Sequence, residues 1–156
     1  MRREILVYPD PFLARKAAPV AEVDNRIQVL IRDMFQTMYG AEGIGLAAPQ
    51  VGVGKRVVVL DVSPVDETIA PLALVNPEIV SRKGSVTAVE GCLSVPGIQG
   101  EVCRAETVEV HGMDEQGNPL RIRAAGILSR ALQHEIDHLD GVLFIDRLSS
   151  SPAASA

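Results

Sequence analysis

Two histidines and a glutamate within five residues are the part of this chain best suited to chemistry. His134-Glu135-Ile136-Asp137-His138 has the form H-E-x-x-H and lies in a stretch whose apolar spacing predicts a helix. Residues four apart on a helix share one face, so both imidazoles can bind one metal ion. The glutamate can then act as a general base toward a water on that ion. The pattern predicts a hydrolase, although a core helix with hydrogen-bonded histidines would look the same.

A catalytic site of this kind needs a third protein ligand. One metalloprotease pattern places a histidine six residues after the second histidine, but Phe144 stands there. Thermolysin-like proteases use a downstream glutamate, and no acidic residue follows Asp146. His111, on a strand-like stretch, is a weak candidate. Cys92 is the stronger candidate, because a thiolate is a good ligand for Zn²⁺ or Fe²⁺.

The composition is that of a soluble globular protein of one domain, with 47% apolar and 22% charged residues in 156. A net charge of −5, with scattered Lys and Arg, argues against direct nucleic-acid binding. No apolar run approaches the ~20 residues of a membrane span, and no leader pattern is present. We therefore expect a cytoplasmic protein without membrane contact. Two cysteines are too few for a disulfide framework.

The hydrophobic pattern predicts an α+β fold, with antiparallel strands packed around a central C-terminal helix that carries H-E-x-x-H, and an N-terminal helix. The helices are predicted at residues 24–39, with Asp24 as N-cap, and at 125–139. Strands are predicted near 56–62, 71–75, 77–82, 85–89, 101–103, 106–112 and 120–124, with a hairpin turn at 114–118. Residues 43–50 are expected to be irregular and 142–145 extended. A catalytic domain at 1–148 and a disordered tail at 149–156 complete the prediction.

Three motifs, taken in order, give the chain a specific resemblance to a known family. GIGLAAPQ at residues 43–50, EGCLS at 90–94 and QHEIDH at 133–138 match motifs of the peptide deformylases. The N-terminal helix, Arg104 and residues 139–144 match as well, so the resemblance covers nearly the whole chain. Many bacterial members continue into a long C-terminal helix, whereas this chain stops after residues 149–156. We expect that difference to bear on stability and ribosome docking, and not on the chemistry.

The resemblance implies the metal site and its base. Cys92, His134 and His138 correspond to the family's metal ligands, and Glu135 corresponds to its catalytic acid and base. The implied cofactor is one Fe²⁺ per chain, for which Zn²⁺, Ni²⁺ or Co²⁺ can substitute. The implied reaction is hydrolysis of the N-formyl group of N-formylmethionyl peptides, with release of formate.

The resemblance also implies how the peptide is held. Gln50 and the backbone N–H of Leu93 correspond to the donors that face the oxyanion. Residues expected to contact the substrate backbone or its methionine side chain are Ile44, Gly45, Gly91, Ile127 and Ala131. Arg130 is expected at the mouth of that pocket, and the pair of Arg104 and Glu90 is either a plain ion pair or a support for the cysteine loop.

Formylated peptides are the expected partners, with a transient contact to the ribosome. Two other interpretations remain open. In a structural metal module, the ion would close the fold without turnover. A metalloprotease would instead cut internal peptide bonds.

Overall fold

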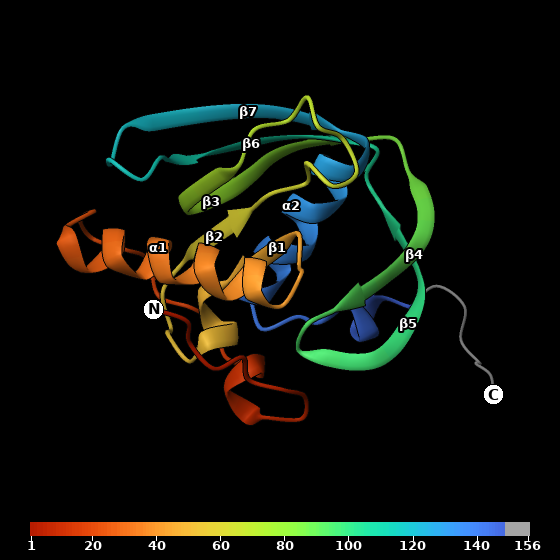
Figure 1. Ribbon diagram of the computed structural model, residues 1–156. Coiled ribbons are helices and arrows are strands. Elements are labelled where there is room, and N and C mark those ends of the chain that lie inside the picture. Colours follow the sequence, from red (N-terminus) through yellow and green to blue (C-terminus); the bar gives the residue numbers. More distant parts are fainter. Residues whose placement is uncertain (149–156) are drawn as a thin grey trace.

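Five strands form one antiparallel sheet, and two more form a separate ribbon, in a computed structural model that describes residues 1–148 (Figure 1). The sheet contains, in spatial order, β1 (Gly45–Ala47), β2 (Val57–Leu60), β3 (Leu72–Lys83), β6 (Thr107–Met113) and β7 (Pro119–Ala125). The ribbon pairs β4 (Val86–Cys92) with β5 (Val95–Arg104). Every pairing between these strands is antiparallel, as predicted. The predicted tail at 149–156 lies outside the described residues.

Both predicted helices are present within one residue of the expected bounds. α1 spans Asn25–Gly40, and the Asp24 side chain accepts hydrogen bonds from the backbone N–H groups of Arg26 and Ile27. This is the N-cap arrangement that the sequence indicated. α2 spans Gly126–Leu139. None of the helices in residues 1–148 combines the length and the hydrophobicity needed to cross a lipid bilayer.

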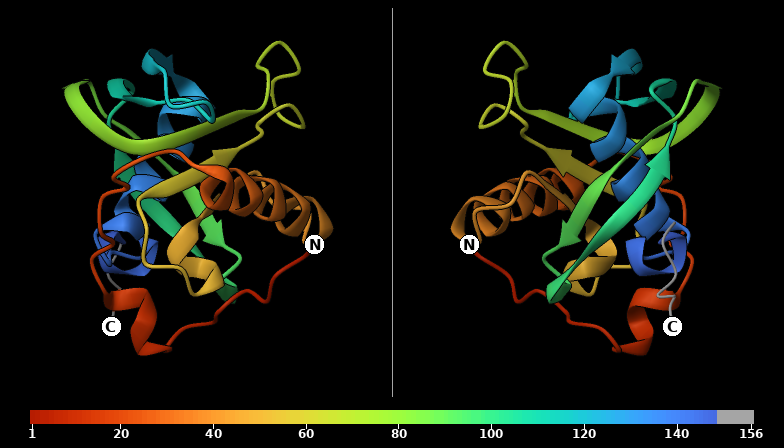
Figure 2. Two further views of the ribbon diagram at one scale, coloured as in Figure 1. Left: turned by 90° about the vertical axis from the view of Figure 1, so that its left-hand side faces the viewer. Right: turned by 90° about the vertical axis from the view of Figure 1, so that its right-hand side faces the viewer.

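α2 runs through the middle of the molecule, with the five-stranded sheet on one side and the β4–β5 ribbon on another (Figures 1 and 2). Its apolar side chains join the core cluster of the sheet, where Leu132 and Leu139 are fully buried. Burying such a side chain stabilises the fold by about 1.5–3 kcal/mol. Their partners from the sheet are Val58, Leu60, Leu74, Val108 and Val110. The helix that carries the two histidines is therefore fixed by the core.

The prediction for residues 43–50 was wrong. Gly45–Ala47 form the edge strand β1, which pairs with β2, and Ala48–Val51 form a 3-10 turn. Backbone pairing with a buried neighbour strand makes this strand, and its Gly-Leu-Ala sequence carries no β-branched signal of its own. The extended course expected for 142–145 was also wrong at its end, because Phe144–Arg147 form a 3-10 turn.

The segments predicted at 71–75 and 77–82 are one strand, β3, bent at Asn76. Asn76 has a φ of 52°, and the register with β6 shifts next to it. Its side-chain amide donates to the Val20 carbonyl and accepts from the Val20 N–H, which stabilises this backbone. Asparagine is one of the few residues that tolerate the left-handed region.

Candidate metal centre and adjoining pocket

Cys92, His134 and His138 come together, although they belong to different elements. Their ligand atoms all lie within 4.8 Å of one another. The histidines are buried on successive turns of α2, and Cys92 is the last residue of β4, at the tip of the ribbon. Cys92 Sγ lies 3.3 Å from His138 Nε2. The other candidate ligand, His111, is on β6 and pairs with Glu109, outside this group.

His134 is oriented by a carboxylate behind it. Its Nδ1 lies 3.0 Å from Glu90 Oε1. Burial by itself raises the pKa of Glu90, but hydrogen bonds from His134 and Arg104 lower it to about 2. An ionised carboxylate only accepts, so His134 Nδ1 carries the proton of this bond and Nε2 remains for a ligand.

The two imidazoles differ in their affinity for protons. Burial, and then the charges of His134 and Arg104, hold the pKa of His138 well below its usual range. Burial lowers the pKa of His134 too, but hydrogen bonds with Cys92 and Glu90 outweigh it and raise the pKa to about 10. A metal ion bound at His134 Nε2 would take the place of a proton on that atom.

The donor set fits a transition-metal ion. One sulfur and two imidazole nitrogens suit Zn²⁺ or Fe²⁺ better than Mg²⁺ or Ca²⁺, which prefer oxygen. The Cys92 sulfur also accepts from the Ser94 N–H at 3.4 Å and lies 3.7 Å from Gln50 Nε2. Three protein ligands leave a coordination position open, as in catalytic sites.

Glu135 is buried beside this group and, among the described residues, lacks a partner on one of its two oxygens. Its Oε1 has no hydrogen-bond partner within residues 1–148. Burial, the largest influence, raises the pKa of Glu135 to about 7. Gly45 leaves room for the carboxylate, because a Cβ at that position would lie 2.5 Å from Glu135 Oε2. A carboxyl poised near neutrality in a cleft is suited to proton transfer.

Gln50 is held by both ends of its amide. Its Oε1 accepts from the Ala47 N–H at 2.9 Å, and its Nε2 donates to Ser94 Oγ at 3.1 Å. The Nε2 group thus faces the cysteine sulfur. Leu93 lies in the turn directly after Cys92. Ser94 was not singled out from the sequence, since its contact with Gln50 forms only when the segment after Cys92 lies against the 3-10 turn Ala48–Val51.

A cavity of about 670 Å³ opens beside Glu135 and His134. It is lined by all the residues predicted to hold the peptide, namely Ile44, Gly45, Gln50, Gly91, Leu93, Ile127 and Ala131. The ribbon adds lining residues that sequence reasoning missed, namely Val89, Val95, Gly97, Ile98 and Gln99. They face the cavity because β4 and β5 pair, and no local motif marks them.

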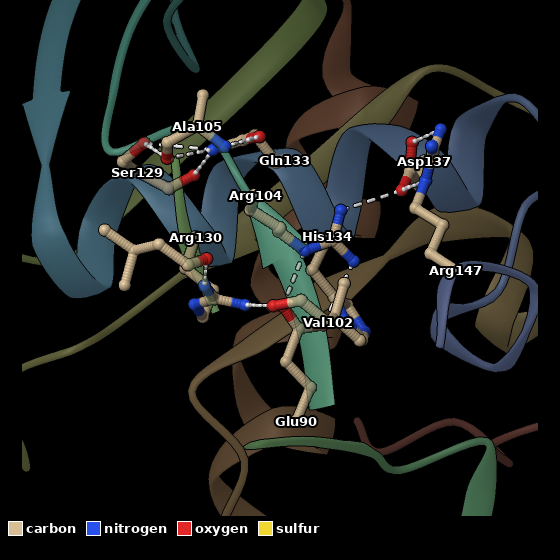
Figure 3. Close-up of polar contacts among 11 residues, drawn as sticks. Glu90, Val102, Arg104, Ala105, Ser129, Arg130, Gln133, His134, Asp137 and Arg147 are labelled. Atoms are coloured by element: carbon tan, nitrogen blue, oxygen red, sulfur yellow. Dashed lines mark hydrogen bonds and ion pairs between the residues drawn. The ribbon is translucent and has the colours of Figure 1, made fainter. Parts of the chain in front are cut away.

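Arg130 fastens α2 to the ribbon at the edge of the cavity (Figure 3). Its guanidinium donates to Glu90 Oε2 at 2.6 Å and to the carbonyls of Val102 and Val86. The Gln133 amide binds both the N–H and the carbonyl of Ala105, just after β5. These contacts place the start of the cysteine loop at a fixed distance from the histidines.

Comparison with known proteins agrees with this geometry. The polypeptide deformylase family model matches residues 2–153. The peptide deformylase of Alkalilimnicola ehrlichii is 53% identical over 146 residues, which are 94% of this chain and 82% of that protein. The crystal structure of a peptide deformylase from Legionella pneumophila superposes with a TM-score of 0.90 at 49% identity, covering 96% of this chain and 87% of the other.

A second solved structure is equally similar. The peptide deformylase of Synechococcus elongatus, in complex with actinonin, gives a TM-score of 0.90 at 47% identity over 94% of this chain and 80% of the other. The chain therefore belongs to the peptide deformylase family, hydrolases that remove the formyl group from the N-terminal N-formylmethionine of newly made polypeptides.

Proposed function

We propose that residues 1–148 form the catalytic domain, with one Fe²⁺ held by Cys92, His134 and His138. Zn²⁺, Ni²⁺ and Co²⁺ are expected to substitute, because the same donors suit all four ions. The observation that carries the proposal is the convergence of one sulfur and two imidazole nitrogens within 4.8 Å at the edge of a cavity. A bound divalent ion would acidify water and polarise a carbonyl group there.

Glu135 is the proton carrier in this proposal. It is buried and unpartnered at Oε1, with a pKa raised to about 7, so it can both take and return a proton near neutral pH. It takes a proton from the attacking water and passes it to the amine that leaves the formyl carbon. Formate and a peptide with a free amino group are the products.

Gln50 and Leu93 supply neutral donors for the carbonyl oxygen. The Gln50 amide is fixed at Oε1 by the Ala47 N–H, so its N–H₂ group needs little reorganisation to meet developing negative charge. The second donor is the backbone N–H of Leu93, the residue directly after the cysteine. Together they stabilise the oxyanion as the formyl carbon becomes tetrahedral.

The cavity holds the formylmethionine end of the peptide. The edge strand β1 at Gly45 offers backbone groups to an extended substrate, as in strand addition. Gly91 on the opposite ribbon leaves room for it. Ile44, Ile127 and Ala131 form an apolar wall for the methionine side chain.

The proposed substrate also indicates where in the cell the protein acts and which partners it meets. Newly made formylated peptides are met in the cytoplasm, beside the ribosome, and we propose a transient contact there. Neither nucleic acid nor membrane is required as a direct partner, which agrees with the net charge of −5.

Metal analysis coupled to formate release tests the proposal. Protein purified without oxygen should carry about one iron per chain and release formate from a formyl-Met peptide. Cys92→Ser should lose metal and turnover together, whereas Cys103→Ser, at an exposed cysteine, should keep both.

The opposite result for the two cysteines would show that the ligand assignment is wrong. Metal-loaded protein that releases no formate would indicate a structural metal module instead. Cleavage at internal bonds of an unformylated peptide would indicate a protease.

A further inference from the structure

Arg104 is a buried cation that joins Glu90, the carboxylate behind His134, to Asp137 of α2. Its side chain is 3% exposed and lies against two carboxylates. Toward the centre, Nε and Nη2 donate to the two oxygens of Glu90, at 2.5 and 3.0 Å. Away from it, Nη1 donates to Asp137 Oδ2 at 2.9 Å (Figure 3). The guanidinium is therefore shared between two carboxylates. Glu90 orients His134, and Asp137 directly precedes His138.

Glu90 has no spare acceptor capacity. Its Oε1 accepts from both Arg104 and His134, at 3.0 Å each, and its Oε2 accepts from Arg104 and Arg130. Arg104 and His134 thus share one oxygen of Glu90. Any change that strengthens the ion pair between Arg104 and Glu90 therefore weakens the hydrogen bond from His134 Nδ1 to Glu90.

Asp137 weakens the pull of Arg104 on Glu90, because it pairs with the same guanidinium. Among the charged groups joined in this network, the guanidiniums of Arg104, Arg130 and Arg147 face only the carboxylates of Glu90 and Asp137. Without Asp137, the buried guanidiniums of Arg104 and Arg130 would both pair with Glu90 alone. Arg104 would then be drawn toward Glu90 alone, the carboxylate that also orients His134.

We propose that Asp137 is a positioning residue that strengthens metal retention through Arg104 and Glu90. It touches no ligand atom. By taking part of the Arg104 charge, it leaves Glu90 free to accept the His134 Nδ1 proton, which keeps Nε2 basic and aimed at the ion. The inference rests on the proposed assignment of His134 as a metal ligand.

Metal release from cobalt-loaded protein into excess chelator tests the inference. Asp137→Asn keeps the shape of the side chain and removes its charge, and we expect release at least 10-fold faster. Asp140→Asn is the matched control, since Asp140 is a half-exposed acid at the end of the same helix and pairs with Arg56 instead. Unchanged release from folded Asp137→Asn would overturn the inference.

A double-mutant cycle separates action through Glu90 from general loosening of the fold. Glu90→Gln alone should speed release, and adding Asp137→Asn to it should have little further effect, because the path from Arg104 to His134 is already broken. Additive losses would mean that Asp137 acts independently of Glu90 and would overturn the inference.

A substitution at Arg147 is expected not to speed cobalt release, in contrast to Asp137→Asn. Its guanidinium competes with Arg104 for Asp137, donating to Oδ2 at 2.6 Å from a half-exposed position. Arg147→Gln frees Asp137 for Arg104, so cobalt should leave no faster than from the unaltered protein. Faster release would show that the salt bridge between Arg147 and Asp137 retains the metal, and would overturn the proposed path through Arg104.

Failure of the inference and failure of the ligand assignment give different results. His134→Ala should lose cobalt outright. If it retained cobalt, the ligand assignment would be wrong whatever Asp137 does. If it lost cobalt while Asp137→Asn kept it, only the inference would be wrong.

Discussion

The central helix α2 meets its two neighbours in opposite ways. Toward the five-stranded sheet it presents aliphatic side chains, among them Leu132 and Leu139, which are fully buried. Toward the ribbon it presents His134, Arg130 and Asp137, which join a network of ion pairs. The contact with the sheet is apolar and has no preferred direction. The contact with the ribbon depends on the charges of the side chains and on the geometry of their hydrogen bonds.

This difference separates stability from chemistry within one helix. Apolar burial is the main favourable contribution to folding, so the sheet side is expected to carry the stability. Buried ion pairs contribute little net stability once desolvation is counted, but they fix orientation. Substitutions on the ribbon side and around the cavity should therefore change metal binding or turnover, with smaller effects on unfolding.

The largest expected effect is on turnover. Glu135→Gln removes the proton acceptor, and we expect formate release to slow by about 10²–10⁴-fold at full metal loading. The unfolding temperature should not fall, because the variant replaces an unpartnered buried carboxyl by a neutral amide. Turnover per metal ion and thermal unfolding are the two measurements. Near-normal turnover would exclude Glu135 as the proton carrier.

The reverse result is expected on the sheet side. Leu132→Ala creates a cavity at a fully buried position and should lower the free energy of unfolding by about 2–5 kcal/mol. Denaturant unfolding measures this, with Val29→Ala at an exposed position of α1 as control. Metal content of the folded variant should be unchanged. A loss of less than about 1 kcal/mol would mean that the sheet contact does not hold the helix.

A smaller effect, on the pH dependence of stability, is expected at Tyr39, which lies outside both contacts of α2. The Tyr39 hydroxyl donates to Asp61 at 2.6 Å, and burial together with Asp61 raises the Tyr39 pKa to about 12. The neutral phenol is favoured in the folded state, so this contribution is complete below about pH 10 and disappears as pH rises toward 12.

Tyr39→Phe should therefore flatten the alkaline fall in stability, by less than about 1 kcal/mol because the side chain is half exposed. Unfolding curves from pH 8 to 12 check this. An unchanged alkaline slope in the variant would show that Tyr39 does not titrate in this range. Formate release at neutral pH should stay the same, since Tyr39 does not line the cavity.

The long periodic elements were predictable from sequence, and the short ones were not. The Ile27, Leu30 and Ile31 spacing and the Asp24 cap define α1 locally, so its bounds were predicted closely. By contrast, β1 exists because β2 lies beside it, and Gly45–Ala47 have no propensity that reveals this. Tertiary pairing decides such segments.

The same division holds for the site. The spacing of His134 and His138 reveals a shared helix face, because helix geometry is periodic. Ser94, Asp137 and the ribbon residue Ile98 gain their positions only through contacts distant in sequence. Asp137 lies inside the most conspicuous motif of the chain, yet its partner Arg104 is 33 residues away, so the sequence gives it no visible role.

The most direct test compares formate and acetate release from two peptides that differ only in the acyl group. In the proposed site, Gln50, Leu93 and the metal held by the α2 histidines all surround the carbonyl group, so we expect room for hydrogen on the carbonyl carbon but not for methyl. Because displacement by about 1 Å can cost ~10²-fold in rate, formyl-Met peptide should be cleaved at least that much faster than acetyl-Met peptide. Equal rates would contradict a formyl-sized site at this metal centre.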